Sequence, residues 1–229
     1  MNRLVAAEWL DELPPADRLA IGSRRDLRLL NFFMGNRAQM QNSLLKLFPE
    51  KPPRRLVELG AGDGTFLLGL ARMLRRRWQG LEVTLVDRQP AISSAIRRGI
   101  EECGWTAKIA TADVFDWLAT ERQFDCVITN LFLHHFSPAE LARLLTLISG
   151  STAGFVSCEP RRSTAGLFTG RLLWLIGCNS ITRHDAPISV RAGFRAHELS
   201  ALWPRDGWQL RESRAGLFTH LFTAKKLVP

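Results

Sequence analysis

The chain has 229 residues, of which 46% are hydrophobic and 23% charged, and its formal net charge is +9. These values fit one globular α/β domain with a sizeable core. The charge could attract nucleic acid, anionic lipid or an acidic substrate. No run of like charges is long enough to mark a binding tail, so we expect a basic surface without a nucleic-acid partner.

Cysteines and apolar stretches restrict the class further. The four cysteines form no CxxC pair and have no Cys/His zinc spacing, so we expect reduced thiols and no structural metal. No apolar stretch reaches the roughly 18 residues of a membrane span. The first residues also lack the apolar core of a signal peptide. The sequence therefore predicts a cytoplasmic protein without a membrane span.

The first 50 residues predict a helical cap. Residues 4–12, 23–34 and 36–48 are helix-like, and prolines and a Gly-Asn pair separate them. The middle segment carries an amphipathic stripe formed by Leu27, Leu30, Phe33 and Met34. We therefore predict a cap at 1–50 and one domain at 51–229.

From residue 55 on, short apolar runs alternate with longer helix-like segments. The runs lie at 55–59, 81–87, 105–110, 124–129 and 153–158, and the helix-like segments lie at 65–77, 90–103, 137–149 and 162–177. Strands that alternate with helices predict a parallel sheet covered on both faces. After a helix-like 196–203, the runs 207–213 and 216–226 predict a hairpin whose final strand is antiparallel.

A glycine loop follows the first run, in the sequence LVELGAGDGTF (56–66). Between a strand and a helix, such a loop presents backbone N–H groups at the edge where doubly wound folds bind ligands. A P-loop would need a lysine after the glycines, and none is near. A GxGxxG dinucleotide fingerprint would need glycine where Thr65 stands, and Asp63 would lie close to a pyrophosphate. The loop therefore favours a ligand without phosphate.

The segment VELGAGDG resembles motif I of class I S-adenosylmethionine-dependent methyltransferases, commonly [DE]xGxGxG. The resemblance implies a Rossmann-like, mostly parallel seven-stranded sheet with an antiparallel last strand, and S-adenosylmethionine as cofactor. By this match Glu58 helps to hold the methionine amino group. Gly60, Gly62 and Gly64, with Ala61 among them, allow the cofactor to approach the backbone closely.

Later segments resemble further motifs of the same family in the same order. Asp87 ends the run TLVD, where the family's acid binds both ribose hydroxyls, and Arg88 follows it. In ADVFDW, Asp113 takes the position that accepts from the adenine amino group, with Val114 beside it, although Asp113 could instead cap a helix. FDCVITNLFLHHF resembles the fourth strand and the loop facing methyl donor and acceptor, which implies a cofactor contact from Asn130.

Methyl transfer to a hydroxyl needs a base, and the chain has no tyrosine. His134 and His135 follow the fourth strand, and LHHFSPAE is similar to the loop of small-molecule O-methyltransferases in which a histidine is the base. By that match His134 takes the base position. Alternatively, the two histidines shape the cofactor pocket or order the loop, and both interpretations stay open at this point.

Two later segments could contribute to the acceptor side. TRHDAPISVRAGF (182–194) is predicted as a loop, in which His184 and Asp185 either form a base with its orienting carboxylate or lie on the surface. The run 165–178 is unusually apolar, and it either lines a pocket for a lipophilic acceptor or covers the sheet.

We expect the partner to be a small-molecule acceptor, methylated on a hydroxyl and lipophilic or aromatic. The residues after the fourth strand are Asn130-Leu131-Phe132-Leu133. Amino-directed nucleic-acid methyltransferases carry [DNS]PP[YFW] there, which disfavours nucleic acid as the acceptor. An RNA or protein methyltransferase, a non-catalytic cofactor-binding protein and an NAD(P)-dependent oxidoreductase stay open as alternatives, as do a monomer and a homodimer.

Overall fold

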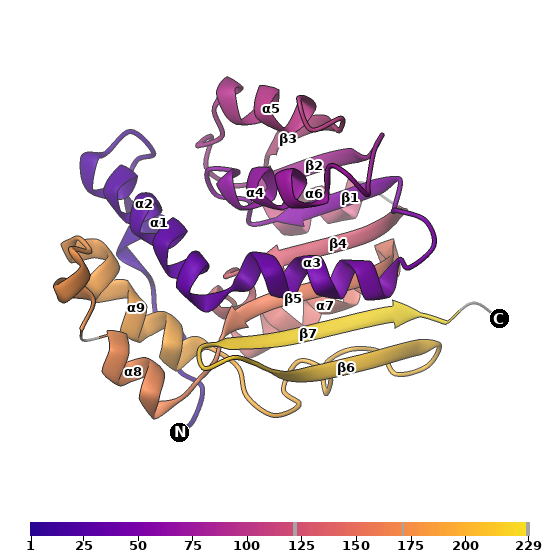
Figure 1. The fold of residues 1–229 in the computed structure, drawn as a ribbon. Coiled ribbons are helices and arrows are strands. Elements are labelled where there is room, and N and C mark those ends of the chain that lie inside the picture. The colour runs from indigo at the N-terminus through magenta and orange to yellow at the C-terminus, as the bar shows by residue number, and fades with distance from the viewer. Residues whose placement is uncertain (121–122, 171, 228–229) are drawn as a thin grey trace.

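The computed structural model describes residues 1–120, 123–170 and 172–227 and is built on a seven-stranded sheet (Figure 1). The strands lie in the order β3-β2-β1-β4-β5-β7-β6. They are β1 (Arg55–Leu59), β2 (Glu82–Asp87), β3 (Thr106–Thr111), β4 (Phe124–Asn130), β5 (Thr152–Pro160), β6 (Trp208–Ala215) and β7 (Thr219–Lys226). Strands β1 to β5 pair in parallel, whereas β7 is antiparallel to β5 and β6. The predicted Rossmann-like sheet with an antiparallel last strand is confirmed.

The central strands are buried on both faces. Every residue of β1 after Arg55 is buried, and β5 exposes only Ala153. Strands covered on both faces are continuous apolar runs, because neither face meets water. This burial explains why the sequence pattern located these strands to within about two residues.

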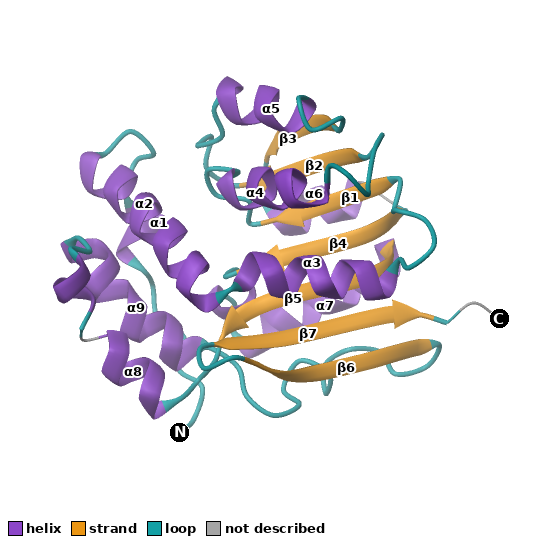
Figure 2. Ribbon diagram, in the orientation of Figure 1, coloured by secondary structure: helices purple, strands orange, loops and turns teal. Residues whose placement is uncertain are grey.

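Helices cover both faces of the sheet (Figure 2). The core on one face includes α3 (Asn36–Leu47), α4 (Thr65–Leu74) and α5 (Ser94–Glu101), and the core on the other includes α6 (Val114–Thr120) and α7 (Pro138–Ser151). Helix α7 begins as predicted, because the Ser137 hydroxyl accepts from the Glu140 N–H and the Glu140 carboxylate accepts from the Ser137 N–H. Helix α5 begins at Ser94 rather than residue 90, because Ser93 caps it.

A second group of helices lies over the carboxyl ends of the parallel strands (Figure 1). It comprises α1 (Trp9–Glu12), α2 (Arg18–Met34), α8 (Thr164–Gly170), η2 (Leu173–Ile176) and α9 (Ser180–Ala192). The N-terminal prediction needs correction here. Only the end of 4–12 is helical, and α2 begins well before residue 23, because Asp17 accepts hydrogen bonds from the N–H groups of Leu19 and Ala20. Gly35, at φ 68°, ends α2.

Two predictions in the C-terminal half were wrong. The predicted loop 182–194 is mostly the helix α9, which the Asn179 side chain caps and which contains Pro187. Proline and polar residues suggested a loop, but packing against α1, α2 and α8 favours the helix. The predicted helix 196–203 is a series of turns, because Ala196 has φ 54° and the Glu212 carboxylate accepts from two backbone N–H groups of this segment.

Helix α3 belongs to the core of the sheet, since Met40, Leu44 and Leu47 pack in the same cluster as β1. The division into a cap at 1–50 and a domain from 51 therefore remains a prediction. Among the described residues, none of the helices combines the length and apolar character needed to cross a membrane.

Candidate active site

The carboxyl ends of the parallel strands open into a cavity of about 900 Å³ beneath α2, α8 and α9. A volume of this size can hold a cofactor and a second molecule together. Nearly all residues predicted for the site line this cavity, namely Glu58, Gly60, Ala61, Gly62, Asp87, Arg88, Asp113, Val114, Asn130, His134 and His135. The fold therefore brings together residues that are distant in the sequence.

The predicted glycines have different roles. Gly60 has φ 71°, and a Cβ atom there would lie 2.1 Å from the ring of Phe132, so only glycine fits. Gly62 has φ 56° with no other atom within 4 Å of an added Cβ, which leaves its backbone open to the cavity. Gly64 does not line the cavity; a Cβ there would lie 2.9 Å from Ile96, so this glycine allows α4 and α5 to pack closely.

Glu58 is a buried carboxylate with one atom lacking a partner. Only 1% of its surface is exposed, and its Oε2 has no hydrogen-bond partner. Burial, together with the nearby charges of Asp63 and Asp87, raises the pKa of Glu58 well above its ordinary value. A cationic group bound in the cavity would donate a hydrogen bond to Oε2 and favour the ionised form of Glu58. Glu58 therefore fits the role predicted for it.

Asp87 and Asp113 face the cavity from neighbouring strand ends. The Asp87 carboxylate accepts from the Gly62 N–H at 2.7 Å and the Gln89 N–H at 2.8 Å, which fixes the glycine loop. Burial raises the pKa of Asp87, so hydrogen-bond donors from a ligand would stabilise its ionised form. Asp113 accepts from the Phe115 N–H at 2.8 Å at the start of α6, so it caps this helix and also lines the cavity.

Asn130 connects three elements. Its amide oxygen accepts from Asn36 at 2.9 Å, and its amide nitrogen donates to Asn31 at 2.9 Å. The Asn36 oxygen accepts in turn from the Thr219 hydroxyl. These bonds tie α2 and α3 to β4 and β7, so the Asn130 side chain organises the wall of the cavity.

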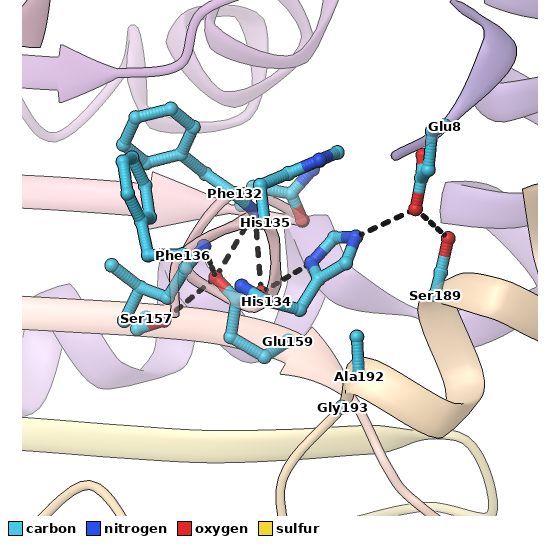
Figure 3. Close-up of polar contacts among 12 residues, drawn as sticks. Glu8, Phe132, His134, His135, Phe136, Ser157, Glu159, Ser189, Ala192 and Gly193 are labelled. Carbon is cyan, nitrogen blue, oxygen red and sulfur yellow. Dashed lines mark hydrogen bonds and ion pairs between the residues drawn. The ribbon is translucent and has the colours of Figure 1, made fainter. Parts of the chain in front are cut away.

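The loop after β4 is held by a carboxylate that the sequence analysis did not single out. Glu159, fully buried in β5, accepts hydrogen bonds from the backbone N–H groups of Phe132, Leu133 and His134 and from the Ser157 hydroxyl (Figure 3). This arrangement fixes η1 (Leu133–His135), which follows Leu131 at φ 53°. An acid inside the apolar run FVSCEP was the available signal.

His134 lies between two carboxylates. Its Nδ1 is 2.9 Å from Glu159 Oε2, and its Nε2 is 3.4 Å from Glu8 Oε1 (Figure 3). The Ser189 hydroxyl also donates to Glu8 at 2.5 Å. Burial of His134 lowers its pKa, but the hydrogen bonds and charges of Glu159 and Glu8 raise the pKa by more. The resulting pKa is about 9. Both ring nitrogens of His134 are therefore protonated at neutral pH. The positive charge of this imidazolium allows both carboxylates to stay ionised in the interior.

His135 has a different environment from its neighbour. Its Nδ1 lies 3.1 Å from Asp11 Oδ2, and its side chain is 25% exposed towards the cavity. Among the described residues, no protein group bonds its Nε2. Since Asp11 holds the proton on Nδ1, the lone pair of Nε2 is available to a molecule in the cavity.

The N-terminal segment supplies both Glu8 and Asp11, and several contacts hold it in place. The Arg3 guanidinium donates to backbone oxygens of the η1 loop and of Ala192, including Phe136 O at 2.8 Å. The Asp185 carboxylate accepts from the N–H groups of Trp9 and Leu10, both at 3.0 Å. His184 donates to Asp185 at 2.7 Å and stacks on Trp9. His184 and Asp185 do face each other, but their contacts hold α1 in place and do not involve His134 or His135.

Glu8, His134 and His135 are residue types that bind metals, and their donor atoms all lie within 4.8 Å of one another. However, both ring nitrogens of His134 already contact carboxylate oxygens, and its pKa of about 9 keeps the imidazole ring positively charged at neutral pH. The charged imidazolium of His134 therefore takes the position, next to Glu8, that a metal cation would otherwise take.

Comparisons with known proteins found similar methyltransferases. Residues 56–152 match a family model described as "Methyltransferase domain". A trans-aconitate 2-methyltransferase of Mycobacterium tuberculosis is 32% identical over 103 residues, which are 44% of this chain and 35% of that protein. The chain thus spans about a third of the length of this curated relative.

Two solved structures have the same fold at low sequence identity. The plantazolicin methyltransferase BpumL in complex with SAH has a TM-score of 0.65 at 13% identity and covers 92% of this chain and 91% of its own. The mitomycin 7-O-methyltransferase MmcR has a TM-score of 0.62 at 17% identity, over 95% of this chain and 60% of its own.

Proposed function

We propose that this chain, which has the class I methyltransferase fold and carries a methyltransferase domain at residues 56–152, transfers the methyl group of S-adenosylmethionine to a hydroxyl of a small, largely apolar molecule. The observation that carries the proposal is Glu58, which lines the cavity and whose buried Oε2 has no hydrogen-bond partner. An unpaired carboxylate at this depth calls for a cationic ligand group.

The residues of the cavity fit the cofactor part by part. Glu58 would accept from the methionine ammonium group, and Asp87, already oriented by Gly62 and Gln89, would accept from the ribose hydroxyls. The second oxygen of Asp113 would accept from the adenine amino group. The open backbone of Gly62 permits close approach of the nucleoside. When bound, S-adenosylmethionine supplies an electrophilic methyl group on a positively charged sulfur.

The proton of the acceptor would go to His135. His135 lines the cavity, its Nε2 is bonded by no described protein group, and Asp11 would stabilise the imidazolium that forms. The acceptor oxygen thereby loses its proton as it gains the methyl group. His134 is already protonated between Glu8 and Glu159, so we assign it to holding the loop rather than to accepting the proton.

The acceptor side of the cavity supports an apolar substrate. Leu30 and Met34 of α2, Leu173 of η2 and Val190 of α9 line it, together with Phe136 after η1. MmcR, which shares the fold, is by its name a 7-O-methyltransferase, and this supports a hydroxyl as the acceptor.

Isothermal calorimetry tests the cofactor assignment. S-adenosylhomocysteine should bind to the protein, and Glu58→Gln and Asp87→Asn should each weaken binding by about tenfold or more. NADPH should not bind. A protein that binds NADPH and ignores S-adenosylhomocysteine would overturn the proposal, whereas cofactor binding without methylation of any phenol or hydroxyquinone would leave only the acceptor assignment wrong.

A further inference from the structure

The outer face of α2 is both apolar and cationic. Arg18, Ile21, Arg25, Arg28 and Phe32 follow one another at intervals of three and four residues and are all exposed. Such spacing places them along one side of the helix. Leu29 and Phe33 flank this row, and the exposed fractions are 55% for Ile21, 72% for Phe32 and 62% for Phe33.

No acid of α2 itself lies on this face, although Arg28 pairs with Asp63 of the glycine loop at 2.8 Å. The only acid within α2 is Asp26, and its Oδ2 accepts from the Asn179 N–H at 2.7 Å and from the Thr182 hydroxyl at 2.8 Å. Asp26 therefore points towards α9. The exposed row thus combines large apolar side chains with guanidinium groups, a composition typical of helices that lie in the headgroup region of a membrane.

A second exposed apolar segment also borders the cavity. Phe168 of α8 is 65% exposed, and in η2 Trp174, Leu175 and Ile176 are 59%, 60% and 47% exposed. Large apolar side chains are seldom concentrated on the surface of a protein without a partner. The inner sides of both segments line the cavity, through Leu27 and Leu30 of α2 and through Gly170 and Leu173 of α8 and η2.

We propose that the outer face of α2 and the α8–η2 segment, which together we name the cavity rim, dock on the surface of a bilayer containing anionic phospholipid. The apolar side chains enter the headgroup region, and the arginines contact the lipid phosphates. A second copy of the chain fits this face less well, because a two-fold contact would bring like-charged rows of arginine together in a protein of net charge +9. Docking places the apolar cavity at the membrane surface, where lipophilic molecules concentrate.

Vesicle sedimentation with the full chain, without cofactor, tests this inference independently of methyl transfer. Vesicles of equal parts phosphatidylglycerol and phosphatidylcholine should bind the protein about tenfold more tightly than vesicles of phosphatidylcholine alone. Raising the salt concentration should weaken the binding. Equal affinity for the two vesicle types, or no binding to either, would overturn the inference.

Matched variants locate the surface. Arg25→Glu should weaken binding to anionic vesicles by about tenfold or more, and Phe32→Ser should weaken it several-fold. Arg195→Glu and Leu217→Ser change exposed residues outside the cavity rim and should bind as the parent does. Thermal melting and S-adenosylhomocysteine binding confirm that each variant is folded. Self-association that Phe32→Ser abolishes, in a protein that ignores anionic vesicles, would show that the face binds another copy instead.

Discussion

The Nδ1 of His134 lies 2.9 Å from Oε2 of Glu159, and this contact connects the loop after β4 to the end of β5. The same carboxylate accepts from consecutive backbone N–H groups of that loop. On its other side, His134 reaches Glu8 of the N-terminal segment. One imidazolium thus joins two strand ends and the segment that closes the cavity.

Glu159→Gln tests how much this connection stabilises the protein. A neutral side-chain amide at this position cannot balance the positive charge of His134. Its NH2 group would also face the backbone N–H groups of the loop, which need an acceptor. Because one member of a buried ion pair is lost, the free energy of unfolding should fall by about 3 kcal/mol. Urea denaturation measures the change. Glu101→Gln, in an exposed pair with Arg97, should change it by less than about 0.5 kcal/mol. A loss as small as that in Glu159→Gln would contradict the role of this carboxylate.

The pKa of His134 predicts a pH dependence of stability. Its value is raised from 6.5 to about 9 in the folded protein. The folded state therefore holds a proton that the unfolded state releases above pH 6.5, so stability falls as the pH rises from about 6.5 to about 9. The expected loss is on the order of 3 kcal/mol. Chemical denaturation at several pH values should show this slope, and His134→Gln should flatten it. An unchanged slope in that variant would assign it to another group.

Removal of the proposed base should affect turnover more than cofactor binding. His135→Ala should lower kcat by about two to three orders of magnitude, because the acceptor hydroxyl would lose its proposed base. Asp11→Asn should lower it by about tenfold to a hundredfold, through loss of the orienting carboxylate. The affinity for S-adenosylhomocysteine should stay within about threefold of the parent in both variants. Near-normal turnover in His135→Ala would rule out His135 as the base.

Gly60→Ala tests the contact between the glycine loop and Phe132. The new methyl group would overlap the Phe132 ring and would also require a positive φ of an alanine. We expect a loss of about 2 kcal/mol or more in stability, together with loss of S-adenosylhomocysteine binding. Gly80→Ala is the matched control, because Gly80 has the same φ of 71° but no atom within 4 Å of an added Cβ. Its cost should be about 1 kcal/mol, with binding retained. Equal losses of stability and of binding in the two variants would mean that the positive φ, and not the contact with Phe132, causes them.

Asp185→Asn should loosen the N-terminal segment. The Asp185 carboxylate accepts from the N–H groups of Trp9 and Leu10 and orients His184 against Trp9. With a neutral amide, amide hydrogens of residues 4–12 should exchange about tenfold faster or more, while those of β1 and β4 keep their protection. KM for the acceptor should also rise. Asp206→Asn, at an exposed position, should change neither the amide exchange nor KM. Unchanged exchange and KM in Asp185→Asn would mean that other contacts alone hold the segment.

The glycine loop and the strand-end acids could be predicted from the sequence because each is a local pattern. Gly60 and Gly62 follow a buried strand directly, and Asp87 and Asp113 stand at strand ends in chain order. A parallel sheet places all its carboxyl ends at one edge, so these positions could be located together without any long-range information. Helix α9 could not be predicted in this way, since its interior proline argues against a helix until packing against α1 and α2 is known.

The sequence by itself therefore determined the type of fold, through the alternation of strands and helices, and it located the cavity-lining glycine loop and acids through contiguous motifs. Only the tertiary structure separated the environments of the two adjacent histidines. His134 and His135 look alike in LHHF, yet one is buried between Glu8 and Glu159 and the other is held by Asp11 and lines the cavity half-buried. The carboxylates that make this difference come from the N-terminus and from β5. Their proximity depends on how the chain folds back on itself, because the pKa and the accessibility of a histidine are set by its neighbours in space.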